Sequence, residues 1–204
     1  LCNYFVYRYG MSSACRVVAW SGDNPCSLAG LGLQQAGDVA VSMGTSDTMF
    51  TMMSNARPGL DGHVLKNPVD PDSFMGMLCF RNGSLAREDV SERCAEGDWD
   101  KFSQHLSQTK PGNGGAIGFY YLDPEITPTT GDAAGVQRFD ASGSTVDQFD
   151  AATEIRAVVE GKFLAMRLFG EGIGMDLREV KVGTQTLQSF GKRDASWHSN
   201  AIFH

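Results

Sequence analysis

Two apolar runs separated by a short glycine-containing turn form the clearest pattern early in the chain. In residues 38–43, Val39 and Val41 alternate with small or polar neighbours, and a second apolar run covers residues 47–53. Alternation with period two predicts β-strands. Because only Gly44-Thr45-Ser46 lies between the runs, we expect a β-hairpin whose tip carries a row of backbone N–H groups.

The segment before this hairpin predicts a strand, a loop and a helix. Residues 16–20 are rich in β-branched and apolar side chains, which favours a strand. Asn24 followed by Pro25 is typical of a helix start, with Asn24 as N-cap and the proline in the first turn. We therefore expect a helix over residues 25–35 that ends at Gly37.

Further elements follow in alternation, and the strongest of them is a helix starting after the cap residue Asp150 and ending near residue 170. In it Ile155, Val159, Phe163 and Met166 recur at three- and four-residue spacing, so one face should pack on a sheet. The other expected elements are strands at 74–80, 116–122, 136–139 and 179–182, a helix capped by Asn82 or Ser84 to about residue 94, a helix over 99–107 capped by Asp98, and a surface loop over 124–145. Residues 185–204 show no sustained period.

Composition narrows the class of protein and its partners. The 204 residues include 17 Lys and Arg against 24 Asp and Glu, a formal charge of -7 without a basic cluster, so we expect no nucleic-acid partner. The five cysteines are widely spaced, which favours reduced thiols in the cytoplasm. No apolar run is long enough to span a membrane, and the first residues lack a signal-peptide pattern. We expect one cytoplasmic α/β domain, and the pattern leaves its oligomeric state open.

Asp23 and the turn Gly44-Thr45-Ser46 are the leading candidates for chemistry. A carboxylate in a loop after a strand can accept the proton of an attacking hydroxyl, and Asn24 beside it could hold it in place. Unshielded N–H groups and small hydroxyl side chains in a turn suit phosphate oxygens. Each feature also has a purely structural interpretation, as a helix cap and as an ordinary turn.

Other candidates are weaker. Trp99, on a short helix, is either a packing residue or a flat surface for a purine ring, and Gly112-Asn113-Gly114-Gly115 is either an ordinary turn or a close approach of backbone to ligand. The four histidines do not lie at metal-ligand spacing, so we expect no metal site built by the protein. The sequence has neither a Walker-type loop nor a Gly-x-Ser-x-Gly elbow.

A series of segments nevertheless occurs in a recognisable order. They are Tyr4-Phe5-Val6 with Arg8-Tyr9-Gly10, Ser21-Gly22-Asp23-Asn24-Pro25, Val41-Ser42-Met43-Gly44-Thr45-Ser46-Asp47-Thr48, Cys79-Phe80-Arg81-Asn82-Gly83-Ser84-Leu85, Gly112-Asn113-Gly114-Gly115 and Pro124-Glu125-Ile126-Thr127-Pro128. In this order they resemble the second domain of the FGGY family of carbohydrate kinases, most closely its xylulose-kinase branch in animals. The resemblance covers about residue 3 to about residue 174.

This resemblance implies a ribonuclease-H-like α/β fold of the actin and hexokinase type, and a cleft that closes over sugar and ATP. It implies that Asp23 is the general base, that Asn24 beside it contacts the sugar, and that the reaction converts D-xylulose and ATP to D-xylulose 5-phosphate and ADP. Gly44, Thr45 and Ser46 resemble the turn that faces the ATP phosphates, and Trp99 a nucleotide contact. Mg²⁺ would arrive bound to ATP.

Two departures from the family pattern limit these expectations. The first half of such a kinase, with part of the sugar site, has no counterpart here, and Val182-Gly183-Thr184-Gln185-Thr186 stands where the family has a Thr-Gly-Gly-Ala-Ser loop for adenosine. We expect an incomplete kinase domain over residues 1–174, a divergent tail over 175–204, and little activity from this chain alone. Two alternatives stay open: a non-catalytic binding module derived from a kinase, and a kinase for another ketose, a polyol or gluconate.

Overall fold

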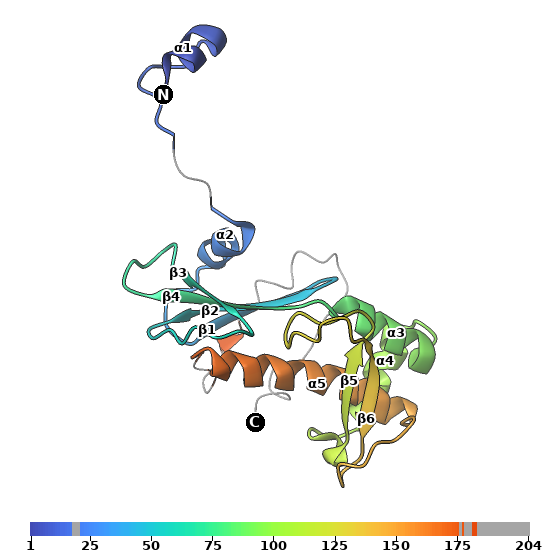
Figure 1. Ribbon diagram of the computed structural model, residues 1–204. Coiled ribbons are helices and arrows are strands. Elements are labelled where there is room, and N and C mark those ends of the chain that lie inside the picture. The colour runs from blue at the N-terminus through green and yellow to red at the C-terminus, as the bar shows by residue number, and fades with distance from the viewer. Residues whose placement is uncertain (18–20, 176, 178–180, 183–204) are drawn as a thin grey trace.

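A five-stranded sheet forms the centre of the computed structural model, which describes residues 1–17, 21–175, 177 and 181–182 (Figure 1). The strands are β1 (Asp38–Met43), β2 (Asp47–Met53), β3 (His63–Lys66), β4 (Phe74–Phe80) and β7 (Lys181–Val182), in the order β3-β4-β2-β1-β7. The pairs β3–β4, β4–β2 and β2–β1 are antiparallel, and the pair β1–β7 is parallel. The predicted hairpin of residues 38–53 is confirmed, since Met43 pairs with Asp47 across the turn.

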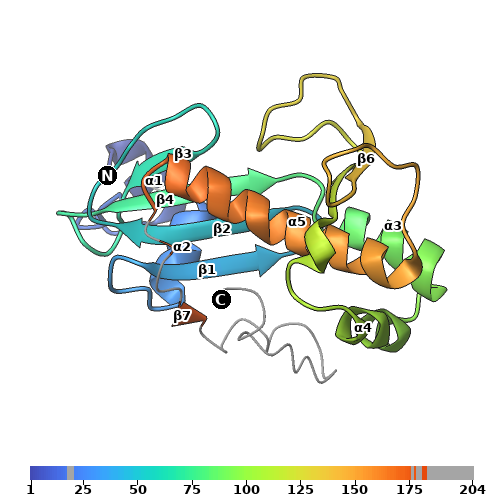
Figure 2. The same cartoon turned by 90° about the horizontal axis from the view of Figure 1, so that it is seen from below.

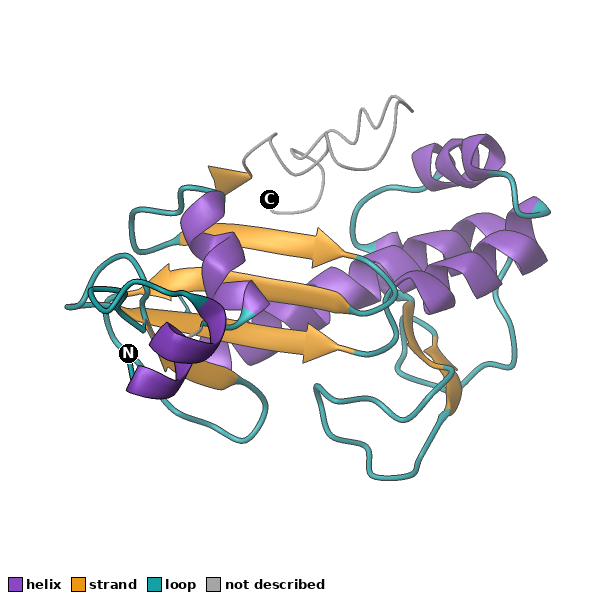
Figure 3. Cartoon of the chain, turned by 90° about the horizontal axis from the view of Figure 1, so that it is seen from above, coloured by secondary structure: helices purple, strands orange, loops and turns teal. Residues whose placement is uncertain are grey.

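Helices cover both faces of this sheet. The short helix α2 (Asp23–Gly30) lies on one face and the long helix α5 (Ala151–Gly172) on the other (Figures 2 and 3). Alternate residues of β2 supply both contacts: Phe50 and Met52 pack with Leu28 of α2, whereas Met49 and Met53 belong to the core against α5. Because successive side chains of a strand point to opposite faces, a continuous apolar strand is buried on both sides.

A second layer of elements packs around the first half of α5, beyond the end of the sheet where β1 and β4 finish (Figure 2). It consists of α3 (Ser84–Ala95), α4 (Trp99–Gln108), a 3₁₀ turn (Asn113–Gly115) and the two-stranded sheet of β5 (Ile117–Tyr121) and β6 (Gly135–Phe139). Their apolar core contains Val90, Phe102, Tyr120 and Ile155. The helix α1 (Asn3–Tyr9) stands apart from both layers and has no buried residue (Figure 1).

The helix caps predicted from the sequence are correct at two positions and wrong at two. The predicted cap of α3 at Asn82 or Ser84 is wrong, because α3 begins at Ser84 with Gly83 as N-cap and no side chain caps it. Asp98 accepts hydrogen bonds from the N–H groups of Asp100 and Lys101, and Asp150 caps α5 in the same way. By contrast α2 begins at Asp23 with Gly22 as N-cap, and it ends at Gly30 rather than residue 35. Pro25 is therefore the third residue of the helix, a position that it tolerates because N–H groups of the first turn have no partner within the helix.

Some expected elements are incomplete or were missed. The strand expected at 16–20 falls mostly on residues 18–20, outside the described residues, and residues 16–17 have no regular structure. The strand expected at 179–182 is described only as Lys181–Val182, and the stretch 185–204 lies outside the described part. Neither α1 nor β3 was expected. The surface loop expected over 124–145 is wrong at its start, because Glu125 and Thr127 are buried.

Candidate functional site

The turn Gly44-Thr45-Ser46 lies at the tip of the β1–β2 hairpin, against the start of α3. The carbonyl oxygens of Gly44 and Thr45 accept hydrogen bonds from the N–H groups of Ser84 (2.7 Å) and Gly83 (3.1 Å). Thr45 is exposed. Within the described part of the chain, the N–H groups of Gly44, Thr45 and Ser46 donate to no protein group. Unsatisfied N–H groups in consecutive turn residues are suited to bind an anion.

Asp23 and Asn24 lie at the start of α2. The Asp23 side chain is exposed, and its Oδ1 accepts a hydrogen bond from the backbone N–H of Asn24 at 2.8 Å. The expected support thus comes from the Asn24 backbone. Among the described residues no hydrogen bond or ion pair joins Asp23 or Asn24 to the turn 44–46.

Trp99 is the first residue of α4, next to the capping residue Asp98. Its side chain is 42 % exposed, and its ring packs against that of Phe102 with centroids 5.2 Å apart. Figures 2 and 3 place α4 beyond the same end of the sheet to which β1 runs before the turn. The ring is therefore anchored on one side while much of its surface stays accessible, as stacking on a base requires.

A buried cluster of charged and amide groups behind the turn was not foreseen. The Glu125 carboxylate is fully buried and accepts hydrogen bonds from the N–H groups of Arg81 (2.5 Å), Ile126 (2.8 Å) and Asn82 (3.2 Å) and from the Asn82 side chain (3.0 Å). Lys162 of α5 lies 3.5 Å away and also sits 4.7 Å from the centre of the Phe80 ring. This cluster ties the β4–α3 connection to α5.

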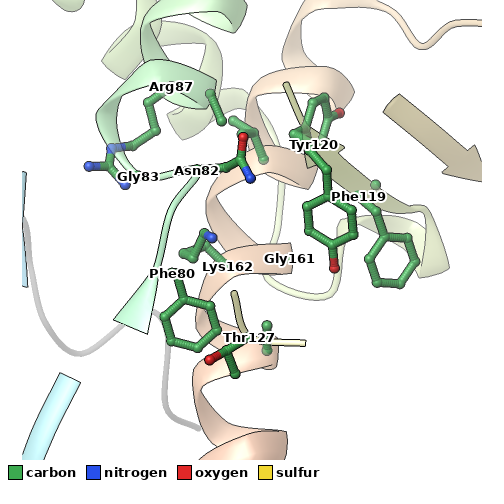
Figure 4. A pocket seen from close by; sticks show the side chains of 14 residues that line it. Phe80, Asn82, Gly83, Arg87, Phe119, Tyr120, Thr127, Gly161 and Lys162 are labelled. Atoms are coloured by element: carbon green, nitrogen blue, oxygen red, sulfur yellow. The ribbon is translucent and has the colours of Figure 1, made fainter. Parts of the chain in front are cut away.

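The two charges of this cluster respond to burial differently. Desolvation lowers the pKa of Lys162, and the nearby Glu125 only partly offsets it. Burial by itself would raise the pKa of Glu125, but the hydrogen bonds from Asn82 and Ile126 and the charge of Lys162 bring it below its ordinary value. Beside them is a cavity of about 30 Å³, lined by Asn82 and Lys162 among others (Figure 4), which has room for water but not for a nucleotide.

The glycine-rich turn at 112–115 has a structural role. The Asn113 side chain donates to the carbonyl oxygens of Ala116 and Thr153, and the Gly112 N–H donates to Glu160. These bonds fasten the turn to α5, so the ordinary-turn alternative is favoured. Among the described residues there is no group of three or more His, Cys, Asp or Glu placed to hold a metal ion, and no helix of that part is long and apolar enough to cross a bilayer.

Comparison with known proteins identifies the relatives of this chain. It is 47 % identical over 191 residues to xylulose kinase 2 of Arabidopsis thaliana and 49 % identical over 172 residues to xylulose kinase of Mus musculus, alignments that cover 88 % and 84 % of the chain. The chain is homologous to the xylulose kinases. It spans 34 % and 30 % of these two relatives, about one third of their length. No protein-family model matches it.

Solved structures agree with this homology to the xylulose kinases. Xylulose kinase of Bifidobacterium adolescentis superimposes with a TM-score of 0.62 at 26 % identity, covering 78 % of this chain and 31 % of its own. Xylulose kinase of Rhodospirillum rubrum gives 0.64 at 16 % identity, covering 85 % of this chain and 35 % of its own, which shows the fold alone. These neighbours are FGGY sugar kinases with the actin and hexokinase type of fold, so the predicted α/β fold class is confirmed.

Proposed function

We propose that this chain is part of an ATP-dependent cytoplasmic kinase that converts D-xylulose to D-xylulose 5-phosphate. The observation that carries the proposal is the 47–49 % identity to two xylulose kinases over most of the chain. The hairpin turn supports it independently, because the N–H groups of Gly44, Thr45 and Ser46, which have no acceptor among the described residues, suit the nucleotide phosphates. Trp99 would provide the surface for the purine.

In this proposal Asp23 accepts the proton of the sugar hydroxyl as that oxygen attacks the γ-phosphorus of ATP. An exposed carboxylate at the start of α2 is accessible to a substrate, and positioned general bases contribute about 10²- to 10⁴-fold to rate. Asn24 would contact the sugar. Mg²⁺, bound to ATP, would neutralise part of the phosphate charge. The remaining contribution is positioning of the two substrates in line.

The test uses a chimera in which this chain replaces the matching segment of the mouse xylulose kinase, assayed for ADP release with D-xylulose, ATP and Mg²⁺. We expect turnover by the chimera, a loss of about 10²-fold or more in Asp23→Asn, and negligible ADP release by the chain alone. Asp100→Asn, another exposed carboxylate at the start of a helix, serves as the matched control and should keep normal turnover. Near-normal turnover of Asp23→Asn would refute the general-base role.

The same chimera tests the sugar. A solved gluconate kinase of Lactobacillus acidophilus also superimposes on this chain, with a TM-score of 0.57 at 19 % identity, so the fold does not select one substrate. Turnover with D-xylulose is compared with turnover on another ketose, a polyol and gluconate. A higher kcat/KM for one of these than for D-xylulose would replace D-xylulose in the proposal while leaving the kinase assignment in place.

One observation favours the second candidate, a non-catalytic binding module. The helix α1 has no buried residue and exposes Tyr4, Phe5, Tyr7 and Tyr9, and it stands apart from the sheet (Figure 1). Exposed aromatic clusters are typical of interaction surfaces. The partner would be the part of a xylulose kinase that this chain does not span. Binding of this chain to that part is measured by calorimetry. Binding that is lost in the double variant Tyr4→Ser, Phe5→Ser would support the binding module. Absence of binding by the unmodified chain would refute it.

A further inference from the structure

The turn 44–46 is held from outside the hairpin by a buried ion pair. Asp47, the first residue after the turn, has a fully buried side chain, and both its oxygens are bonded to the Arg87 guanidinium on α3, at 2.6 and 3.0 Å. Arg87 itself is mostly buried. Such a bidentate pair restricts both distance and orientation, which a single hydrogen bond does not. Asp47 is therefore tied to a helix forty residues away in the sequence.

Gly83 brings the start of α3 into close contact with the same turn. A Cβ atom at Gly83 would lie 2.7 Å from the Asp47 nitrogen and from the Gly44 carbonyl oxygen, and 2.8 Å from Asp47 Oδ1. These are backbone atoms and a paired carboxylate, which cannot move aside cheaply. Only glycine at this position allows the N–H groups of Gly83 and Ser84 to reach the turn carbonyls. Figure 4 shows Gly83 and Arg87 together at the start of α3.

These contacts use the carbonyl oxygens of the turn and leave its N–H groups available. The carbonyl oxygens of Gly44 and Thr45 are occupied by the N–H groups of α3, so the turn cannot rotate to expose them without losing those bonds. The turn N–H groups stay without a protein acceptor in the described part of the chain. A phosphate would otherwise be repelled by carbonyl oxygens, so occupying them on the α3 side prepares the turn for an anion.

We propose that Asp47, Arg87 and Gly83 are positioning residues that hold the turn 44–46 in the shape that binds the nucleotide phosphates, an inference that rests on the proposed kinase function. These residues act through the turn and do not touch the phosphates themselves. Their effect should consequently depend on how many phosphates the ligand carries. A variant that only lowers the stability of the fold should weaken the binding of ligands with one phosphate and with three phosphates equally.

The experiment follows the backbone amide NMR signals of Gly44, Thr45 and Ser46 in the full 204-residue chain during titration with ATP and, separately, with AMP. Arg87→Lys keeps the positive charge but cannot form the bidentate pair. Gly83→Ala keeps both charged residues but forces the turn, and the Asp47 carboxylate with it, away from α3, so it tests the same idea by a different route. The matched control is Arg93→Lys, the same substitution on the same helix, whose arginine bonds to Asp89 and Glu154 instead of the turn. Circular dichroism and thermal unfolding confirm that each variant is folded.

In the unmodified chain ATP should shift the turn signals more strongly than AMP. Arg87→Lys and Gly83→Ala should each weaken ATP binding about tenfold, the effect of losing roughly one charge-assisted hydrogen bond, with a smaller change for AMP. ATP binding in both variants as tight as in Arg93→Lys would overturn the positioning role and leave the turn's nucleotide role intact. No response of the unmodified turn to ATP would refute the nucleotide role, and the positioning role with it.

Discussion

Replacing Glu125 by Gln should destabilise the fold far more than its small change in shape suggests. One oxygen of the buried carboxylate accepts the N–H groups of Arg81 and Ile126, and the other accepts the backbone and side-chain N–H groups of Asn82. A Gln amide keeps only one oxygen, so either orientation sets its NH₂ group against two donors. At about 1.5–3 kcal/mol for each hydrogen bond to a charged group, the expected loss is about 3–6 kcal/mol.

The matched control for this prediction is Glu171→Gln. Glu171 is exposed, and it pairs with Arg167 one helical turn away at 3.0 Å. Exposed pairs of this kind contribute about 0.3–0.5 kcal/mol. Urea unfolding followed by circular dichroism gives the free energy of unfolding of each variant. Equal, small losses in Glu125→Gln and Glu171→Gln would refute the claim that the buried carboxylate organises the β4–α3 connection.

Two further predictions concern acid stability and helix packing. Burial would raise the pKa of Glu154, but hydrogen bonds from Arg138 and Arg93 bring it below the ordinary 4.5. The ionised carboxylate therefore stabilises the fold above pH 4.5, and this stabilisation is lost as the pH falls through the lower pKa of the folded state. Between about pH 7 and about pH 3 the free energy of unfolding should fall less steeply in Glu154→Gln than in the unmodified chain, and an unchanged slope would contradict this. In α5, a Cβ at Gly161 would lie 2.6 Å from the Gly118 carbonyl oxygen, whereas nothing lies within 4 Å of one at Gly172. Gly161→Ala should therefore lower the free energy of unfolding, measured in urea, by about 1–3 kcal/mol. Gly172→Ala should leave it unchanged or raise it by up to about 1 kcal/mol. Equal effects of the two substitutions would show that the close contact at Gly161 is relieved without strain.

Local signals in the sequence predicted most of the regular elements. The hairpin of residues 38–53, the caps Asp98 and Asp150 and the long apolar stripe of α5 all depend on residues a few positions apart. Where the signal was ambiguous the prediction failed. Asn24 followed by Pro25 predicts a helix that begins at Pro25, whereas α2 begins two residues earlier, at Asp23. Proline is tolerated throughout the first turn, so its position does not mark the first residue.

The candidate site was predicted residue by residue but not as an arrangement. The turn 44–46 follows β1, and the helix α4, which begins at Trp99, lies beyond the end of the sheet to which β1 runs (Figure 2). Asp23 lies on α2, and among the described residues no hydrogen bond joins it to the turn. The roles of Asp23, Asn24, the turn and Trp99 stay predictions that the chimera can test. The similarity to two xylulose kinases, over 88 % and 84 % of the chain, supports them.

Patterns among residues a few positions apart predict the strands, the helices and the hairpin, and the ordered segments indicate the resemblance to carbohydrate kinases. Only the tertiary structure showed that Glu125, in a segment expected to be a surface loop, is a buried charge, and that Asp47 is paired with Arg87 behind the turn. The physical reason is desolvation. Whether a charged side chain is buried depends on partners brought from forty or more residues away, and no local pattern records them.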